Sequence, residues 1–526
     1  MFDLLKTGID GLDAVLGGGV RYPQGTAAFM FITGGPGSGK TLLALETVTR
    51  AWLGGEDGST CLYYSVEQSP DNLHKKLESD FEFYGLAGDV SVLEREVPNK
   101  LCLEATTARG RTRLVLTQAN PASLESTDRG APVVDVEWII AEIGNYRLAG
   151  GVNMVCIDNV GLLLTDLDYF AKRQKLLASR HVLMSQSIHG IFVQEESDPR
   201  DLRVPSAEEF STDLLIRLSF LEQPGGFKAR SLEIHKARHQ YYYRGVQHFS
   251  IAGRGSVARL LGARSERGPG IHIYPSVAAQ LSIARDRSEL VVPKRGSEPI
   301  DLGHPDLAAP FLHGTGPTAG SSSVLLAEPG TRYTYLALRF LAAGQRRDEP
   351  TLLISTKEDP DALARVCARE PELEPHCLGE DGNFKDRFRI LYLHPEYISP
   401  GKLTWDALRA AAGEGRQPPA VRLAFDNVFQ LQDRFPLVDN QSFLVSALLD
   451  LLRYRGITPL FVDLVPPGSA HGRVDFDPSR YMTTFDNVFH LYLERHGDEH
   501  RPFLRVLKST ASDFKHSPRP VDYRRA

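Results

Sequence analysis

The segment Gly-Gly-Pro-Gly-Ser-Gly-Lys-Thr at residues 34–41 constrains this chain more than any other stretch. It fulfils the complete pattern G-x-x-x-x-G-K-[ST]. Before it, residues 27–32 form a short apolar run that predicts a buried strand. After it, residues 41–48 are good helix formers, and Gly54-Gly55 predicts the end of that helix. A strand, a glycine-rich turn and a helix in this order predict a phosphate-binding loop.

Each residue type in this loop has a chemical reason to be there. Glycines let successive backbone N–H groups turn toward a polyphosphate, and the helix N-terminus adds partial positive charge. Lys40 is expected to reach the β- and γ-phosphates, and Thr41 to ligate Mg²⁺. A glycine-rich turn with a chance lysine is the alternative, which the flanking strand and helix oppose. The predicted cofactors are ATP and Mg²⁺, with the nucleotide held by Gly35, Pro36, Gly37, Ser38, Gly39, Lys40, Thr41 and Leu42.

Length and charge limit what else the chain can be. With 526 residues it is too long for one hydrophobic core. The net charge of −6 gives no global electrostatic support for binding bulk nucleic acid or an anionic membrane, although a local basic patch stays open.

The cysteines and the N-terminal residues bear on the cellular compartment in which the chain is expected to fold. None of the five cysteines forms a C-x-x-C pair, which argues against a disulfide framework or a zinc ribbon. The first residues lack a basic start followed by an apolar stretch, and no apolar run approaches the length of a membrane span. The sequence therefore predicts a cytoplasmic protein without a membrane segment.

A glycine-rich entry precedes the first predicted strand. Residues 7–19 read T-G-I-D-G-L-D-A-V-L-G-G-G. Followed by the phosphate loop, this segment resembles the opening of KaiC and related RecA-like ATPase domains. The resemblance implies an α/β fold, in which a mostly parallel sheet is flanked by helices.

A carboxylate follows the next predicted strand, residues 60–66. Glu67 is expected at the carboxyl edge of the sheet, where it can orient the water that attacks the γ-phosphate. KaiC-family domains usually carry two adjacent glutamates here, whereas this chain has Glu67 and Gln68. The alternative for Glu67 is an ordinary surface charge at a strand end.

A second acid ends the apolar run 151–158. This is the Walker B form, in which a buried strand delivers Asp158 to the Mg²⁺ shell. Its distance along the chain from Lys40 suits a RecA-like core. Gln194, at the end of the strand 189–193, is either a γ-phosphate sensor or a surface polar residue.

Two cations follow the strand 230–235. In KaiC-like proteins the lysine and arginine of a K-x-R segment at this place reach the nucleotide of the neighbouring subunit. The resemblance therefore implies that Lys236 and Arg238 act in trans and stabilise the phosphoryl transition state. The chain departs from the family at residues 239–242, and the alternative is an exposed basic strand end.

Residues 88–135 are less regular. Arg109, Arg111 and Arg113 lie on an apparent strand, and the polar stretch 120–130 follows. A solvated loop is the favoured interpretation of that stretch. A ring-pore loop or a partner-binding loop is the alternative.

The second half of the chain repeats the first without its chemistry. Aligned on the loop, residues 327–334 fall on residues 34–41, and Tyr333 stands in place of Lys40. Gly330 survives among the glycines, and Glu328 brings a negative charge to a phosphate site. We align Glu358 with Glu67. The remaining pairs are Asp426 with Asp158, Lys508 with Lys236, and Thr510 with Arg238.

The sequence thus predicts two tandem RecA-like domains, an active one at 1–276 and a degenerate one at 277–526. KaiC has ATP sites in both domains and phosphorylates residues in its second domain. Here Thr483 and Thr484 lie near a predicted strand, but without a loop lysine we expect no kinase activity. The basic, proline-containing tail from residue 517 is expected to be disordered, with a partner-binding handle as the alternative.

The favoured function is ATP hydrolysis in the first domain within a homo-oligomeric ring, which the resemblance implies is a hexamer with sites shared between subunits. The second domain would be a pseudo-ATPase that serves as a scaffold or as the platform for an unidentified partner protein. Turnover would act as a regulatory switch. The alternatives are a DNA-dependent motor of the RecA or helicase type, and a nucleotide-binding signalling module that hydrolyses little.

Overall fold

The computed structural model places most of the chain in two compact units, Met1–Ala279 and Gln280–Ala526. The residues that the structure describes are 1–80, 83, 89–93, 97, 99–119, 136–149, 151–164, 167–196, 212–222, 228–253, 269–286, 298–312, 316–393, 399–413, 417–428, 441–467, 478–496, 499–510 and 512–524.

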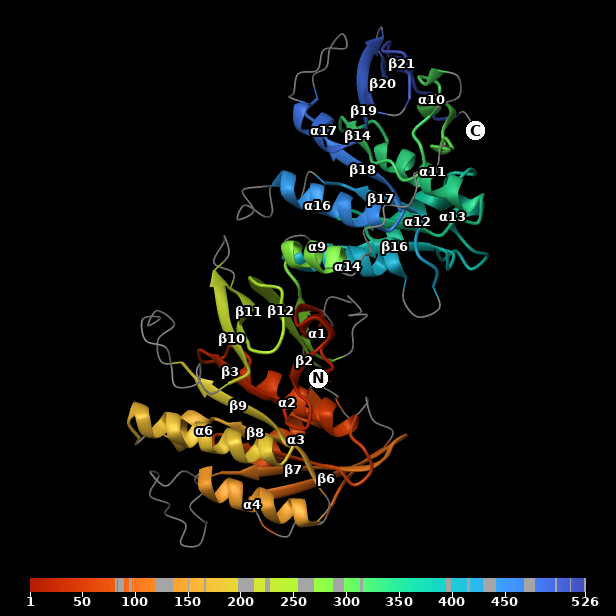
Figure 1. Cartoon of the computed structure of the whole chain (residues 1–526). Coiled ribbons are helices and arrows are strands. Elements are labelled where there is room, and N and C mark those ends of the chain that lie inside the picture. Colours follow the sequence, from red (N-terminus) through yellow and green to blue (C-terminus); the bar gives the residue numbers. More distant parts are fainter. Residues whose placement is uncertain are drawn as a thin grey trace. The chain divides into compact units, whose positions relative to one another are not determined.

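The first unit is built on one large sheet (Figure 1). Its strands are β3 (Phe29–Gly34), β4 (Thr60–Ser65), β5 (Asp89–Val92), β6 (Lys100–Thr107), β7 (Gly110–Gln118), β8 (Val152–Asp158), β9 (His189–Glu195), β10 (Leu214–Glu222), β11 (Lys228–Ala237), β12 (Val246–Ala252) and β13 (Gly270–Tyr274). Their order is β13-β12-β11-β10-β3-β9-β8-β4-β7-β6-β5. The strands from β10 to β7 in this order run parallel, and those on either side are antiparallel.

Helices cover both faces of this sheet. They are α2 (Lys40–Leu53), α3 (Pro70–Lys75), α4 (Val136–Ala149), α5 (Val160–Leu163) and α6 (Tyr169–Ser185), with a π-helical turn, η1, at Lys76–Asp80. Ile139 of α4 and Leu176 of α6 share a core with Phe29, Leu62 and other side chains of one sheet face. Because side chains alternate along a strand, the intervening residues of β4 face α2 instead.

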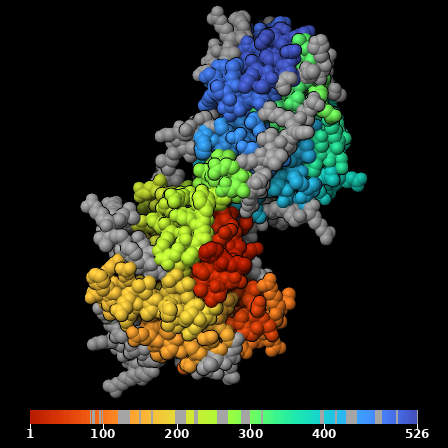
Figure 2. Space-filling model, viewed as in Figure 1, coloured from red at the N-terminus to blue at the C-terminus, as the bar shows by residue number. Residues whose placement is uncertain are grey.

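The N-terminal segment packs beside the strand end near residue 240. It contains β1 (Phe2–Leu5), α1 (Asp10–Val15) and β2 (Val20–Pro23), and β1 pairs with β2. The Arg21 N–H donates to Gln240 Oε1 at 2.6 Å, and the Gln240 amide donates to the carbonyls of Leu16 and Gly19. Figure 2 shows the first residues, in red, beside the yellow-green segment of β10 to β12. The glycine-rich entry is thus a packed part of the unit.

The second unit has a smaller sheet of the same kind. Its strands are β14 (Ser323–Ala327), β15 (Thr351–Ser355), β16 (Phe388–Tyr392), β17 (Arg422–Asp426), β18 (Thr458–Leu464), β19 (Asn487–His496), β20 (Glu499–Ser509) and β21 (Arg519–Pro520). Their order is β16-β15-β17-β18-β14-β19-β20-β21. The strands from β16 to β19 run parallel, and β20 and β21 are antiparallel.

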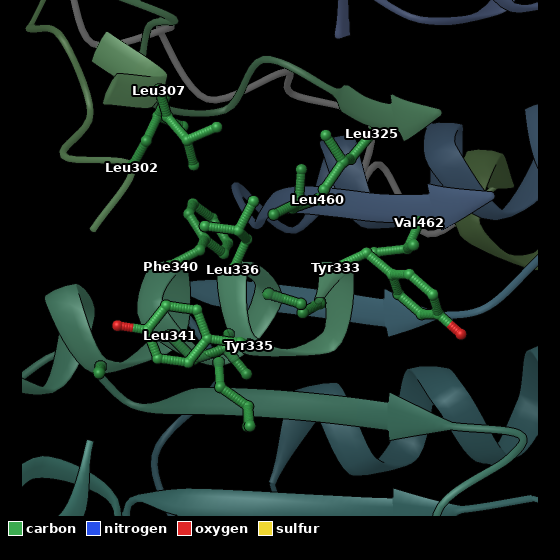
Figure 3. Close-up of a cluster of buried hydrophobic side chains, with 14 of the residues drawn as sticks. Leu302, Leu307, Leu325, Tyr333, Tyr335, Leu336, Phe340, Leu341, Leu460 and Val462 are labelled. Carbon is green, nitrogen blue, oxygen red and sulfur yellow. The ribbon is translucent and has the colours of Figure 1, made fainter. Parts of the chain in front are cut away.

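Helices cover this sheet on both faces as well. They are α10 (Pro305–Ala308), α11 (Tyr333–Gln345), α12 (Pro360–Ala368), α13 (Glu374–Cys377), α14 (Pro400–Ala412), α16 (Gln441–Tyr454) and α17 (Ser479–Thr484), and α9 (Val277–Asp286) links the units along the chain. Figure 3 shows the core under α11, where Leu336 and Phe340 pack with Leu325 of β14 and Leu460 of β18. A second cluster joins the other face to Leu403 of α14 and Leu448 of α16.

The two units repeat one strand order. The order β7-β4-β8-β9-β3-β10-β11-β12 of the first unit corresponds to the complete order of the second. The first unit adds β5, β6 and β13 at its two edges. The predicted α/β fold with mostly parallel sheets is confirmed, and the faint sequence repeat corresponds to a repeated topology.

The structure differs from the sequence-based expectations in the arginine strand and in the C-terminal tail. Of the three arginines predicted to lie on a strand, Arg111 and Arg113 belong to β7, whereas Arg109 lies in the turn before it. The polar stretch 120–130 lies outside the described residues. The expected disorder of the tail is wrong for residues 517–524. Arg519 and Pro520 form β21, and Val521 is buried in the core of the second unit. In the part of the chain that the structure describes, no helix is long and apolar enough to cross a membrane.

Candidate active site

The phosphate loop joins the end of β3 to the start of α2. Gly39, the residue before the helix, has φ 107°, and Gly37 has φ 71°, so both adopt backbone conformations that favour glycine. The Ser38 hydroxyl donates to the carbonyl of Gly35 at 2.8 Å and closes the turn. A Cβ atom at Gly35 or Gly37 would meet nothing within 4 Å, so these glycines border open space.

Lys40 begins α2 and lies across the loop. Its ammonium group donates to the carbonyl of Gly35 at 2.8 Å, and the residue is only 9% exposed. The lysine is therefore folded over the turn in which a phosphate chain is expected to lie. Leu42, the last residue of the predicted nucleotide-binding segment, is also buried.

Asp158 ends β8 at the same edge of the sheet. In register it lies beside Ser65 of β4, and it is 6% exposed. Burial raises the pKa of Asp158, and hydrogen bonds from the side chains of Tyr63 and Thr41 oppose that rise. The negative charge of Glu67 and the positive charge of Lys40 also act on it. The structure thus brings together Lys40, Thr41, Glu67 and Asp158.

Glu67 follows β4 and is exposed at the rim of this site. Its neighbour Gln68 is fixed, because its N–H donates to Ser65 Oγ at 3.1 Å and its Oε1 accepts from Lys76 at 2.7 Å. Gln194 of β9 lies in register with Thr33, beside the loop. An exposed carboxylate next to a fixed amide is an arrangement that can hold a water molecule.

The donor atoms fit a hard divalent cation. The Thr41 hydroxyl and the Asp158 carboxylate are oxygen ligands, which Mg²⁺ prefers, and Mg²⁺ commonly takes its other ligands from phosphates and water. Among the described residues no three His, Cys, Asp or Glu side chains gather as a metal cluster. Thr41 and Asp158 are therefore the groups that would hold Mg²⁺ together with a nucleotide.

The two predicted finger residues are displaced along the strands away from the phosphate loop. Leu215 of β10 is paired with Phe31 on one side and with Lys236 on the other. Gly34, where the loop starts, is level with Leu218 instead. At about 3.3 Å per residue, Lys236 is displaced by roughly 10 Å along the strands from the start of the loop, and Arg238 lies further still.

Arg238 lies near a buried carboxylate of its own subunit. Its guanidinium lies 3.8 Å from Asp213, a buried carboxylate that Arg180 also contacts at 2.7 Å and His239 at 3.6 Å. The Arg238 side chain remains 40% exposed. The K-x-R segment therefore does not join the phosphate loop of its own domain.

The second unit keeps the backbone of the loop but not its chemistry. The Thr331 hydroxyl donates to the Glu328 carbonyl, as Ser38 does to Gly35. Arg332 has φ 53° where Gly39 has φ 107°. Thr334 donates to Asp426 Oδ2 at 2.6 Å, which matches the Thr41–Asp158 contact. The alignments of the two loops and of Asp426 with Asp158 agree with these contacts.

One predicted correspondence is wrong. The N–H of Gln68 donates to Ser65 Oγ, and in the second unit the N–H of Glu358 donates to Ser355 Oγ. Glu358 therefore matches Gln68, and Lys357 occupies the place of Glu67. The sequence alignment slipped by one residue because both strands end in similar polar residues.

The exchange changes the charges around the second loop. Tyr333 replaces the loop lysine and is 8% exposed, and Lys357 interacts with its hydroxyl. Lys357 also forms an ion pair with Glu358 at 3.3 Å. The Glu328 carboxylate is buried and accepts from the N–H of Leu493 at 3.0 Å.

The finger position of the second unit is also altered. Lys508 donates to the carbonyls of Met482 and Phe485 at 2.5 and 2.7 Å, and so caps the end of α17. The N–H of Thr510 donates to the Asp486 carbonyl, as that of Arg238 does to Asp213. The guanidinium has thus been lost.

Sequence reasoning missed one residue of the first site. Tyr63 of β4 is fully buried, and its hydroxyl donates to Asp158 Oδ2 at 2.8 Å. Burial raises the pKa of this phenol well above its usual value, and the charge of Asp158 raises it further. In the sequence Tyr63 looks like one more apolar residue of a buried strand.

Comparisons with known proteins agree with this geometry. A family model described as "ATPase: KaiC" matches residues 5–258. Circadian clock protein KaiC2 of Synechocystis sp. is 24% identical over 96% of this chain and 77% of its own length. KaiC3 of the same organism is 23% identical over 97% of this chain and 88% of its own length. A UPF0273 protein of Aeropyrum pernix is 26% identical over 49% of this chain and 94% of its own length.

The family match covers the unit that holds Lys40, Thr41, Glu67 and Asp158, and the two clock proteins align with both units. The first unit therefore carries a KaiC-type, RecA-like ATPase domain, and the chain as a whole is similar to KaiC-type clock proteins.

Proposed function

We propose that the chain hydrolyses Mg·ATP in its first domain, at a site that a neighbouring subunit of a homo-oligomeric ring completes. The observation that carries this proposal is the convergence of Lys40, Thr41, Glu67 and Asp158 on one phosphate loop. The second domain, with Tyr333 and Lys357 at the equivalent places, is proposed to be a pseudo-ATPase.

Each residue of the first domain has a role. The N–H groups of the loop and Lys40 bind and orient the phosphates, so that the γ-phosphorus faces the rim of the site. Thr41 and Asp158 would hold Mg²⁺, which would neutralise charge on the phosphate oxygens. Glu67 accepts a hydrogen bond from the attacking water and orients it in line with the leaving group.

The register of the sheet supports the shared site. Lys236 and Arg238 lie away from their own loop along the strands, which supports a role for them at the loop of a second subunit. A cation supplied in trans stabilises the charge that develops on the phosphoryl group. Hydrolysis is then coupled to assembly, and a ring, a hexamer by family resemblance, gives every loop a neighbouring finger.

The proposed role of turnover is regulatory. The second domain lacks the loop lysine, the acid at the Glu67 position and the finger arginine, which argues against catalysis and kinase activity there. Its role would be that of a scaffold or a platform for a partner protein. Two relatives over the whole chain carry the name circadian clock protein. The cytoplasmic location stays a prediction.

The first experiment is Glu67→Gln in the full chain. We expect the hydrolysis rate to fall by roughly 100-fold or more, since general-base catalysis commonly contributes at least that much, while nucleotide binding is kept. Glu56→Gln, at an exposed carboxylate away from the loop, serves as the control. An unchanged rate would remove Glu67 from the mechanism, and a negligible wild-type rate would favour the signalling module.

The second experiment tests the shared site. Lys40→Ala and Arg238→Ala are each expected to be inactive alone, and a mixture is expected to regain part of the wild-type rate. Recovery arises where an intact loop meets an intact finger of another subunit. The mass in solution should rise with ATP and Mg²⁺. A lone subunit that hydrolyses ATP at full rate would refute the shared site, and strong stimulation by single-stranded DNA would favour the motor.

A further inference from the structure

Two consecutive tyrosines on β4 donate to two different buried carboxylates. The Tyr63 hydroxyl donates to Asp158 Oδ2 at 2.8 Å and lies 3.5 Å from the Thr41 carbonyl. The Tyr64 hydroxyl, on the other face of the sheet, donates to Glu142 Oε2 at 2.7 Å. Both residues are at most 1% exposed. Only Tyr63 therefore reaches the active site.

The position of Tyr63 restrains the aspartate. A carboxylate at a strand end can rotate about its Cα–Cβ and Cβ–Cγ bonds unless both oxygens meet fixed partners. The phenol is rigid, is held in the sheet and occupies one oxygen of Asp158. The Thr41 side chain contacts the same carboxylate. Asp158 is therefore held in one orientation beside Thr41 before any ligand binds.

The second domain supplies a natural comparison. Matching Ser65 with Ser355 places Leu353 at the position of Tyr63. Asp426 still accepts from Thr334, but its Oδ1 is buried without a hydrogen-bond partner among the described residues. The phenol is thus present where the loop lysine is present and absent where the lysine is lost.

We propose that Tyr63 is a positioning residue that fixes the carboxylate of Asp158 for Mg²⁺. The inference rests on the proposed function, because it assigns Asp158 to the metal. The phenol does not touch metal or nucleotide. It sets the direction of the aspartate oxygens, and partners of this kind commonly change metal affinity by about 10- to 100-fold.

The test uses Tyr63→Phe with Tyr64→Phe as its matched control. Both tyrosines lie on β4, and each variant removes one buried hydroxyl that donates to a buried carboxylate. Binding of a fluorescent ATP analogue to the full chain is followed as Mg²⁺ is added after chelation. We expect Tyr63→Phe to raise the Mg²⁺ concentration for half-maximal binding by about 10-fold, with metal-free binding unchanged. Tyr64→Phe should leave the Mg²⁺ dependence as in the wild type.

A rate measurement separates positioning from a purely structural role. At saturating Mg²⁺ the Tyr63→Phe rate should recover most of the wild-type value, so that the Mg²⁺ requirement changes more than kcat. Tyr63→Leu, which copies the second domain, should behave in the same way and serves if the phenylalanine variant does not fold.

The opposing outcomes are distinct. An unchanged Mg²⁺ dependence in Tyr63→Phe, or an equal shift in Tyr64→Phe, would overturn the positioning role while leaving the proposed ATPase intact. A wild-type chain whose nucleotide binding does not respond to Mg²⁺ would overturn the proposed site, and this inference with it.

Discussion

At the level of single residues, the two domains place different side chains on one backbone. The first loop has Lys40 where the second has Tyr333, and the first strand end has Glu67 where the second has Lys357. The second strand end thus carries a cation at the Glu67 position, and its acid, Glu358, lies at the position of Gln68. Phosphate binding needs a cation in the loop and hydrolysis needs an acid at the rim, so we expect the second loop to lack both functions.

Asp426 is the counterpart of Asp158 in the second unit. Burial raises its pKa to about 6, although the hydrogen bond from Thr334 and the charge of Lys357 oppose the shift. In the unfolded chain an aspartate titrates near its usual value of about 3.9. Above pH 6 the aspartate is ionised in both states, but only the folded state holds that charge away from water. This cost to the stability disappears as the pH falls through 6 toward 4.

We therefore predict that Asp426→Asn stabilises the second domain at pH 8 by about 1–3 kcal/mol. The gain should shrink toward zero at pH 4.5, because the wild-type aspartate is then protonated in the folded state. Thermal unfolding of the full chain at the two pH values measures this difference. Asp386→Asn, at an exposed carboxylate, is the control. Equal stability of Asp426→Asn and wild type at pH 8 would contradict the prediction.

At the level of elements, the C-terminal segment closes the second domain. β21 pairs with β20, and the Tyr523 hydroxyl donates to the carbonyl of Thr331 in the degenerate loop. The Arg332 guanidinium lies 4.7 Å from the Tyr335 ring and 5.3 Å from the Tyr523 ring. Backbone pairing and aromatic packing fix a segment whose composition predicts disorder.

We predict that Tyr523→Ala lowers the stability of the second domain by about 2–4 kcal/mol, because a packed aromatic ring and its hydrogen bond are lost. Arg524→Ala, at the next, exposed residue, should change stability by less than about 0.5 kcal/mol. Denaturant unfolding of the full chain compares the two variants. If both variants unfold at the same denaturant concentration as the wild type, the tail does not contribute to the stability of the second domain.

At the level of the whole molecule, the two units share one strand order, but we propose ATP hydrolysis for the first unit alone. Among the described residues, a loop lysine, the Thr–Asp pair and an acid at the Glu67 position come together only in the first unit, whereas the second unit keeps the pair as Thr334 and Asp426. In the second unit Glu328, Tyr333 and Lys357 fill the loop surroundings with the chain's own groups. We therefore expect a single nucleotide for each chain.

Equilibrium binding of ATP with Mg²⁺ should give a stoichiometry of one for each chain, and Lys40→Ala should abolish it. Tyr333→Lys should not create a second site, because Glu328 and Lys357 still place the wrong charges around the loop. A stoichiometry of two in the wild type, or a nucleotide retained by Lys40→Ala, would contradict this division of tasks.

The sequence by itself determined the features that depend on neighbouring residues. The phosphate loop, the strands that end at Glu67 and Asp158, and the repeat of the loop at residues 327–334 follow from local patterns, since glycine placement and apolar runs act over short distances. The family resemblance rested on the same motifs.

The tertiary structure alone decided the features that depend on pairing across the sheet. The register of β10 and β11 places Lys236 away from the loop of its own domain. The hydrogen bonds of Ser65 and Ser355 show that Lys357, and not Glu358, corresponds to Glu67. Tyr63 became part of the site because β4 lies beside β8, and the tail is ordered because β21 pairs with β20. A side chain's role in these cases is set by a strand distant in sequence, which no local pattern records.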